Sequence, residues 1–340
     1  MIRIKIGLLI LCVLSICSCE KSEWLSEGET FYLENKDAVM PVWVNGNTAS
    51  GTFIIVNHGG AGYTTSLDFH QAKSFQQLEE HYAIVYWDQR MSGMAKGDPR
   101  VSDLSIELHI EDLEKLIILI TQKYNPNSLF IHGHSWGGAL SLGYLGKGNN
   151  QQLIKGWINE DGGLQDQYEM ILRRAWTVEK ANNRYNETGD ASWLEIEEWW
   201  DDNPDANEGD FEPFQFVRDL GGYIYDEDAA NALHDVNRFN LNFRSPYTRY
   251  WRGVQYDDTE WLAGYDFMPQ ARSINIPTLM LWGVEDGSVP VRISDTLYTI
   301  LGTPENNKFS IQYEACAHSP HWEKPDEFYS EVFNFIEAYK

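Results

Sequence analysis

Cysteine and basic residues are both scarce in this sequence of 340 residues. Three of the four cysteines, Cys12, Cys17 and Cys19, lie within the first 19 residues, which leaves Cys316 alone in the rest of the chain. No intramolecular disulfide is therefore possible there. Lys and Arg number 26 against 51 Asp and Glu, so the formal net charge is −25. This charge would repel phosphates and excludes nucleic acid as a partner.

The N-terminal apolar run is short as well: residues 6–16 are too few to span a bilayer comfortably. Basic residues precede this run and small or polar residues follow it, an order typical of a secretory signal. Residues 16–19 resemble the end of a bacterial lipoprotein signal, whose last cysteine becomes the acylated first residue. We therefore predict a lipoprotein-type signal over residues 1–19, which is cleaved before Cys19 so that Cys19 becomes the first residue of the mature protein and carries a lipid. The lipid would anchor an exported bacterial protein to a membrane, facing the periplasm or the cell exterior. An ordinary cleaved signal peptide is the alternative.

The hydrophobic fraction of 43% and the aromatic fraction of 14% are sufficient for a globular core. Buried-strand patterns alternate with helical apolar spacing, both early and late in the chain. This alternation predicts an α/β fold with a mainly parallel eight-stranded sheet, helices on both faces and antiparallel strands at one edge. The predicted strands are residues 29–35, 39–46, 51–60, 83–90, 128–135, 153–163, 276–286 and 308–318. The predicted helices between them are residues 74–82, 106–124, 136–146, 292–301 and 325–340.

The alternation stops between residues 164 and 272, which are rich in Trp, Tyr and acidic residues. Helices are predicted there at residues 167–185, 191–202 and 227–239. We interpret 164–272 as a helical cap, or lid, inserted into a core formed by residues 20–163 and 273–340. A separate helical domain without a role in catalysis is the alternative.

The run Gly133-His134-Ser135-Trp136-Gly137 fits the pattern G-x-S-x-G and lies between a predicted strand and a predicted helix. A sharp turn in this position holds the serine hydroxyl in the open at the carboxyl end of the strand. The pattern therefore predicts Ser135 as a nucleophile rather than as part of a simple turn.

A serine nucleophile needs a base, and the base needs a carboxylate to orient it. Asp286 lies at the end of one late predicted strand and His318 at the end of the next. Ligands bind at the carboxyl ends of strands in open α/β sheets, and the chain order Ser, acid, His is the one expected here. We predict a Ser135–His318–Asp286 triad.

Four nearby residues offer alternatives. His321 could be the base and Asp161 could be the acid. His132 and His134 could hold a metal, but a third ligand at a suitable spacing is missing, so we predict buried hydrogen-bonding roles and no metal.

The oxyanion formed during acyl transfer needs backbone N–H donors. One candidate is the N–H of Trp136, which follows the nucleophile. The other lies in the glycine-rich stretch at residues 57–62, where Gly60 is the predicted donor.

The chain resembles an α/β-hydrolase, and within that superfamily the prolyl aminopeptidase (proline iminopeptidase) family. "HGGAG", "YWDQRMSG", "GHSWGG", "GVEDGSVP" and "AHSPHWEKPDEF" carry the resemblance, which covers residues 28–163 and 273–340. It implies the α/β-hydrolase fold, the triad and oxyanion donors named above, and release of an N-terminal residue such as proline from a peptide without a cofactor. Ala61 and Met91 depart from the family pattern, which usually has proline and glycine there.

The substrate is predicted from the cap. Residues 195–212 contain nine carboxylates and no Lys or Arg, next to Trp199 and Trp200. A cap carboxylate together with Glu160 or Asp161 would pair with the α-ammonium of a small peptide, while the tryptophans pack its side chain. The alternatives are a carboxylesterase or lactonase acting on a small ester, and a catalytically silent lipoprotein that binds at the cell surface. The sequence makes no prediction of the oligomeric state.

Overall fold

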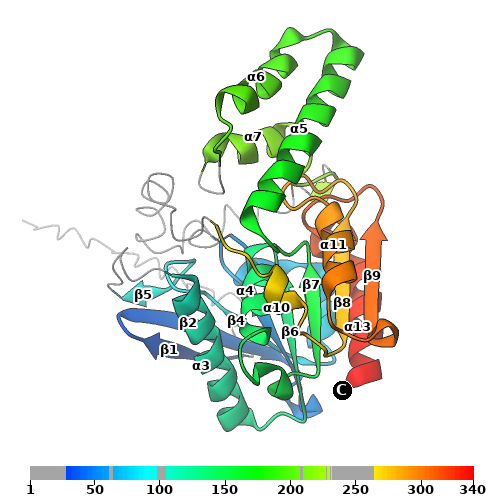
Figure 1. The fold of residues 1–340 in the computed structure, drawn as a ribbon. Helices are drawn as coiled ribbons and strands as arrows, with labels where there is room; N and C mark the ends of the chain where they lie inside the picture. The colour runs from blue at the N-terminus through cyan, green and yellow to red at the C-terminus, as the bar shows by residue number, and fades with distance from the viewer. Residues whose placement is uncertain are drawn as a thin grey trace, which may run out of the picture.

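The computed structural model describes residues 28–60, 64–97, 105–206, 210–226, 228, 229, 231 and 264–340 (Figure 1). Its centre is a nine-stranded sheet in the order β1-β2-β4-β3-β6-β7-β8-β9, with the two-residue strand β5 beside β2. The strands are β1 (Glu29–Asn35), β2 (Ala38–Gly46), β3 (Thr52–Asn57), β4 (Ala83–Trp87), β5 (Lys96–Gly97), β6 (Ser128–His134), β7 (Gly156–Glu160), β8 (Thr278–Gly283) and β9 (Lys308–Tyr313).

The six strands from β4 to β9 along this order, β4-β3-β6-β7-β8-β9, are parallel, whereas β1 and β2 are antiparallel at one edge. This confirms the predicted mainly parallel sheet. The eight predicted strands are all present, and β5 was not predicted because two exposed residues carry no hydrophobic pattern. Because parallel strands end at one edge, the loops after β3, β6, β7, β8 and β9 come together there.

Helices cover both faces of the sheet. Buried side chains of α3, α4, α10 and α11 pack on one face, and those of α1, α2 and α13 pack on the other. The helices of the core are α1 (Leu67–Gln71), α2 (Lys73–Glu79), α3 (Ile106–Tyr124), α4 (Trp136–Leu145), α10 (Met268–Ala271), α11 (Arg292–Ile300), α12 (Pro320–Glu323) and α13 (Pro325–Tyr339).

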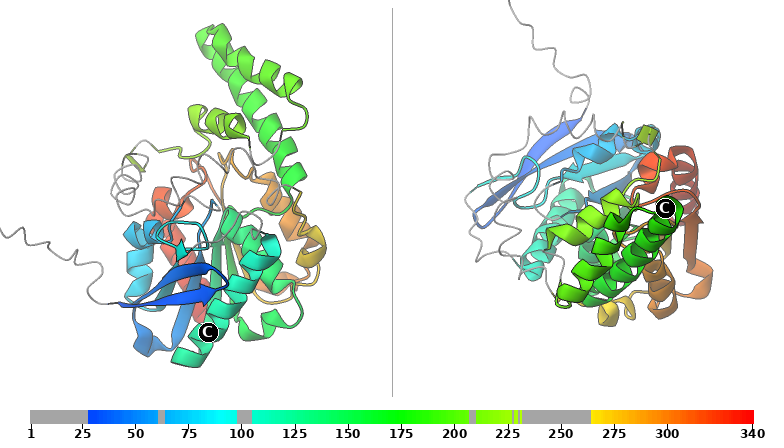
Figure 2. Two further views of the ribbon diagram at one scale, coloured as in Figure 1. Left: turned by 90° about the vertical axis from the view of Figure 1, so that its left-hand side faces the viewer. Right: turned by 90° about the horizontal axis from the view of Figure 1, so that it is seen from above.

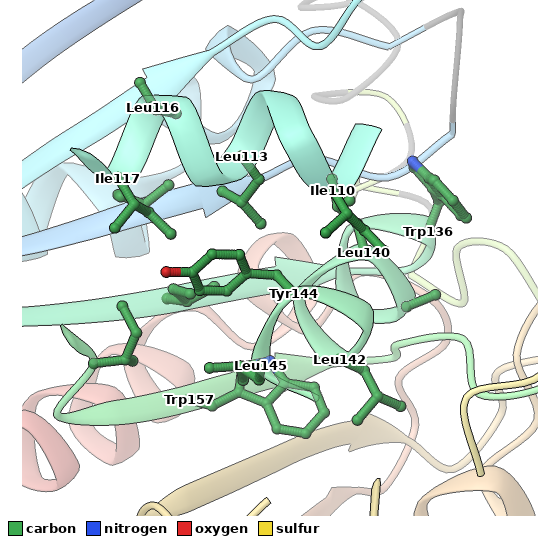
Figure 3. Packing of buried hydrophobic residues seen from close by; sticks show 14 of the residues in the cluster. Ile110, Leu113, Leu116, Ile117, Trp136, Leu140, Leu142, Tyr144, Leu145 and Trp157 are labelled. Atoms are coloured by element: carbon green, nitrogen blue, oxygen red, sulfur yellow. The ribbon is translucent and has the colours of Figure 1, made fainter. Parts of the chain in front are cut away.

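The packing of α3 on α4 explains why the predicted helix at residues 106–124 forms. Its apolar residues recur at helical spacing, and Ile110, Leu113 and Ile117 face α4 and the sheet (Figure 3). The Ser105 side chain caps the helix by accepting a hydrogen bond from the Leu108 N–H at 3.1 Å. Every residue of α4 is buried, so this packing fixes the position of the helix that begins directly after Ser135.

The turn after β4 is held by a buried ion pair. Arg90 and Asp112 are 1% and 0% exposed, and Arg90 Nε and an outer guanidinium nitrogen donate to the Asp112 carboxylate at 2.5 and 2.8 Å. Asn35 donates to the same carboxylate at 2.6 Å. A buried charge is tolerated when it is paired in this two-pronged geometry. The "DQR" turn is thereby joined to α3 and β1.

The described helices that follow β7 form a helical cap beyond the carboxyl edge of the sheet (Figures 1 and 2). The described part of the cap contains α5 (Asp166–Thr188), a 3₁₀ turn at Ala191–Leu194, α6 (Glu195–Asp202) and α7 (Phe211–Asp219). The helices predicted at 167–185 and 191–202 are present, whereas α7 was not predicted. The helix predicted at 227–239 lies mostly outside the described residues.

The cap has a small apolar cluster of its own. Tyr265, Phe267 and Ala271, which the sequence analysis assigned to the cap, instead pack in the core. The predicted boundaries near residues 163 and 272 stay predictions. Within the described part of the chain, no helix combines the length and apolarity needed to cross a bilayer.

Candidate active site

The backbone at Ser135 has a conformation that non-glycine residues rarely adopt. Its φ is 56° and its ψ is −125°, between the end of β6 and the start of α4. The Ser135 N–H donates to the Glu160 carbonyl at 3.1 Å, and the Ser135 carbonyl accepts from Gly138 and Gly163 at 2.9 and 3.0 Å. These hydrogen bonds hold the strained turn, and they leave the side chain half-buried at the carboxyl edge of the sheet.

The glycines of the G-x-S-x-G pattern are required by close contacts. A Cβ added at Gly133 would lie 2.4 Å from the Gly137 carbonyl oxygen, and one at Gly137 would lie 2.0 Å from the Asn57 carbonyl oxygen. No side chain fits at such distances. The two glycines therefore let α4 start directly against β3 and β6.

Asp286 and His318 meet as the sequence predicts. Their Oδ2 and Nδ1 atoms are 2.8 Å apart, and both side chains are buried. The other oxygen of Asp286 accepts the N–H groups of Ser288 and Val289 at 2.7 and 3.0 Å. This carboxylate can therefore orient the imidazole and leave Nε2 as its basic nitrogen.

The loop that bears His318 differs from the prediction in one respect. Strand β9 ends at Tyr313, so His318 lies five residues beyond it in a loop, and not at the end of a strand. Ala315 in that loop has a φ of 50°, a left-handed conformation within the turn that follows β9.

The loop that bears His318 contacts the turn at Ser135 through His134, the residue before the serine. His134 Nε2 donates to the His318 carbonyl at 2.7 Å, and the two ring centroids are 4.8 Å apart. In the described residues, no hydrogen bond joins the Ser135 hydroxyl to His318. Such contacts are often long without substrate and shorten in the substrate complex.

The two alternatives for base and acid have other partners. His321 donates from N and Nδ1 to one oxygen of Glu160 at 2.9 and 2.6 Å, and its ring stacks on Phe69. Asp161 accepts from the Gly283 N–H at 3.0 Å and its second oxygen has no described partner. Burial, followed by Asp286 and Glu160, raises the pKa of Asp161 well above its usual value. Asp161 therefore tends to keep its proton. Without a negative charge it would stabilise an imidazolium poorly.

Glu160 does not face a substrate site, contrary to the prediction. It is fully buried, and its carboxylate accepts hydrogen bonds from His132 and His321. A substrate ammonium could reach it only by displacing these histidines. His132 and His134 are buried and hydrogen-bonded, as predicted.

The predicted oxyanion loop lies directly against Ser135. A Cβ added at Gly59 would be 2.8 Å from Ser135 Cβ, and Gly60 follows with a φ of 54°. Trp136 is the first residue of α4. Residue 61 of the glycine-rich stretch lies outside the described residues.

Gln89 joins the two predicted oxyanion segments, a role that the sequence analysis missed. Its N–H donates to His58 Nε2 at 3.1 Å and its amide donates to the His58 carbonyl at 2.9 Å. Its Oε1 accepts the Trp136 indole N–H at 2.9 Å. The available signal was the "DQR" turn, in which this glutamine is the central residue.

The cap touches the loops that bear Asp286 and His318 through the segment after α7. The Tyr223 carbonyl accepts the His318 N–H at 3.2 Å, and the Gly222 carbonyl accepts the Gly287 N–H at 2.9 Å. The Tyr223 and His318 rings are also 5.7 Å apart. This segment of the cap therefore lies beside the proposed reaction centre.

The two cap tryptophans do not lie there, contrary to the prediction. Helix α6 is at the end of α5 that is remote from the sheet (Figures 1 and 2). Trp200 is buried in the cap, and its indole N–H donates to Thr177 at 3.0 Å. Trp199 packs edge-on against Trp200 and Phe216. Both residues hold the cap together.

The fold brings two further potential metal ligands, Asp161 and His318, close to His134, although their spacing in the sequence does not indicate this. His134, Asp161 and His318 each offer an atom, and these atoms lie within 4.8 Å of one another. One nitrogen of each ring is already engaged, by the His318 carbonyl and by Asp286. The prediction that no metal is used stays a prediction.

Comparison with known proteins gives the family. A family model described as the alpha/beta hydrolase fold matches residues 52–325. A probable aminopeptidase of Bacillus subtilis, YbaC, is 23% identical over an alignment of 294 residues that covers 84% of this chain and 89% of the relative. A proline iminopeptidase of Heyndrickxia coagulans is also 23% identical, over 85% of this chain and 91% of the relative. The crystal structure of a proline iminopeptidase-related protein from Thermus thermophilus superimposes with a TM-score of 0.65 at 16% identity, covering 92% of this chain and 98% of that one. These similarities, together with the sheet order, show that the chain belongs to the α/β-hydrolase fold family.

Proposed function

We propose that the protein is a serine hydrolase in which Ser135 is the nucleophile, His318 the general base and Asp286 the orienting acid. The observation that carries this proposal is the buried Asp286–His318 hydrogen bond at 2.8 Å beside the strained turn at Ser135. Peptidases and esterases among α/β-hydrolases use this set of groups in this chain order.

The reaction follows from these positions. As Ser135 Oγ attacks the substrate carbonyl carbon, His318 Nε2 takes the hydroxyl proton, and Asp286 stabilises the resulting imidazolium. The N–H groups of Gly60 and Trp136 stabilise the negative carbonyl oxygen. His318 then gives the proton to the amine as the bond between the carbonyl carbon and the amine breaks. The product of this step is an acyl-enzyme on Ser135. A water molecule, deprotonated by the same nitrogen, then attacks the acyl carbon. The released product is the carboxylic acid of the substrate, and Ser135 regains its proton from His318.

The substrate that we propose is a small peptide with a free N-terminus, from which the enzyme releases proline or a similar residue. The relatives named as aminopeptidase and proline iminopeptidase support this substrate class. The surplus of carboxylates, with a net charge of −25, also favours a cationic ligand. Recognition of the ammonium falls to carboxylates other than Glu160, because both of its oxygens are engaged.

N-terminal blocking tests this proposal. Pro-p-nitroanilide and Ala-p-nitroanilide should be hydrolysed, and their N-acetyl forms should show kcat/KM values lower by roughly 10- to 100-fold, as expected when a charge-assisted hydrogen bond is lost. Chromogenic release of p-nitroaniline measures both.

Short p-nitrophenyl esters serve as the control. Equal or faster cleavage of the blocked anilides would contradict amine recognition, and ester cleavage that exceeds anilide cleavage would favour a carboxylesterase or lactonase. Absence of turnover on all of these substrates would favour the silent surface lipoprotein.

We also propose that the enzyme is exported and held on a membrane by a lipid on Cys19. The support is the order of basic, apolar and small residues at the N-terminus, which lies outside the described residues. Residues 20–28 would then be a short polar tether. Two acyl chains would anchor the protein stably, whereas one chain gives only marginal binding.

A further inference from the structure

A buried carboxylate with three histidines around it lies behind the proposed triad and takes no part in the mechanism above. Glu160, at the end of β7, is 0% exposed. One of its oxygens accepts from His132 Nε2 at 2.8 Å, and the other accepts from His321 N and Nδ1 at 2.9 and 2.6 Å. The third histidine, His134, lies 5.4 Å from His321 between ring centroids.

The protonation states suit these hydrogen bonds. Burial by itself would raise the pKa of Glu160, but the nearby His321 and the hydrogen bonds from His132 and His321 outweigh it and hold that pKa well below its usual value. Glu160 is therefore an anion that accepts from every neighbour. Burial lowers the pKa of His132 and of His134, so both are neutral rings that donate through Nε2.

Glu160 connects the two parts of the chain that must meet for catalysis. Its main-chain oxygen accepts the Ser135 N–H at 3.1 Å, and its side chain holds His321, three residues after His318. His134, next to Ser135, holds the His318 carbonyl at 2.7 Å. The turn from His318 to His321 is thus tied at one end to β6, which leads into Ser135, and at the other end to β7.

We propose that Glu160 and His321 form a positioning pair, which holds the turn bearing His318 at the distance from Ser135 that proton transfer requires. The inference rests on the roles proposed above for Ser135 and His318. The hydrogen-bonding groups of the pair face each other and not substrate: both oxygens of Glu160 are engaged by His132 and His321, and the His321 ring stacks on Phe69. Loss of the pair should therefore affect the chemical step and leave substrate binding unchanged.

Two substitutions at His321 separate positioning from bulk packing. His321→Leu keeps the apolar contact with Phe69 but removes the donor to Glu160, and it should lower kcat for Pro-p-nitroanilide by about 10²-fold, as a misplaced catalytic group does. KM should stay unchanged, because the interaction lost is not one with substrate. His321→Asn offers an amide N–H near the former position of Nδ1–H and should restore most of kcat.

A matched control is available elsewhere in the fold. His70 on α1 is also a mostly buried histidine whose Nδ1 bonds a glutamate, Glu79, at 2.7 Å. His70→Leu should lower the melting temperature and leave kcat unchanged. If His321→Leu does not fold, Glu160→Gln tests the same pair, since it keeps the shape and places an NH₂ group against N–H donors. It too should lower kcat at unchanged KM.

The outcomes that overturn the proposal are specific. The positioning role fails if His321→Leu folds and keeps its kcat, if His321→Asn is no better than His321→Leu, or if the losses appear in KM. Labelling of the wild-type enzyme by a fluorophosphonate tests the proposed function separately. A wild-type enzyme that is not labelled overturns both proposals, whereas normal labelling with equal kcat in all variants overturns only this one.

Discussion

Replacing Ser135 by alanine is expected to lower kcat by on the order of 10⁴-fold or more, the loss seen when a triad nucleophile is removed. The melting temperature should not change, because alanine keeps the Cβ and the hydroxyl has no hydrogen-bond partner among the described residues. The residual rate then comes from substrate binding and the oxyanion donors alone. Steady-state kinetics and thermal denaturation of the purified variant measure both quantities.

Ser135→Gly is the informative companion. Glycine adopts a φ of 56° without strain, so this variant should be as inactive as Ser135→Ala and more stable than the wild type. Retention of a tenth of the wild-type kcat in either variant would contradict a nucleophilic role for Ser135.

Asp286→Asn is expected to have the other large effect, again on the order of 10⁴-fold in kcat, because an amide no longer holds the required tautomer of His318. Asp161→Asn should cost far less, since Asp161 bonds Gly283 and makes no hydrogen bond to the imidazole in the described residues. Parallel kinetics on the two variants decide between the carboxylates. A larger loss for Asp161→Asn would move the acid to β7.

Asp161→Asn also makes a prediction for the dependence of stability on pH. The pKa of Asp161 is raised in the folded protein, first by burial and then by Asp286 and Glu160. The folded state therefore holds this proton more tightly than the unfolded state, and stability falls as the pH rises from the unfolded pKa of about 3.9 toward the folded value. Asp161→Asn removes this loss, so at pH 8 it should melt at or above the wild-type temperature. A lower melting temperature at pH 8 would show that the ionised carboxylate is required.

Much of the fold was predictable because its signals are local. The buried strands and the 19-residue helix α3 (Ile106–Tyr124) follow from apolar periodicity, and the strand–turn–helix at Ser135 follows from its glycines. Asp286 and His318 could be paired from the rule that loops after parallel strands meet at one edge. Each of these inferences needs only a short window of sequence or a fixed topology.

The predictions that were wrong concern features that depend on contacts between distant parts of the chain or on the size of an element. The burial of Glu160 depends on His132 and on His321, which is 161 positions away in the chain, and no local pattern reports that contact. Trp199 and Trp200 look like a substrate-binding pair in sequence, but the length of α5 carries them away from the sheet (Figure 1). The end of β9 was misjudged because the apolar pattern continues through Cys316 and Ala317, which are buried in a loop.

One measurement tests the central claim most directly: the intact mass of the protein after reaction with a fluorophosphonate, followed by peptide mapping. The account predicts one adduct per chain, located on Ser135, with none on Ser135→Ala and a much slower reaction in Asp286→Asn. No adduct on the folded wild-type protein, or an adduct on another residue, would contradict the assignment of Ser135 as the nucleophile.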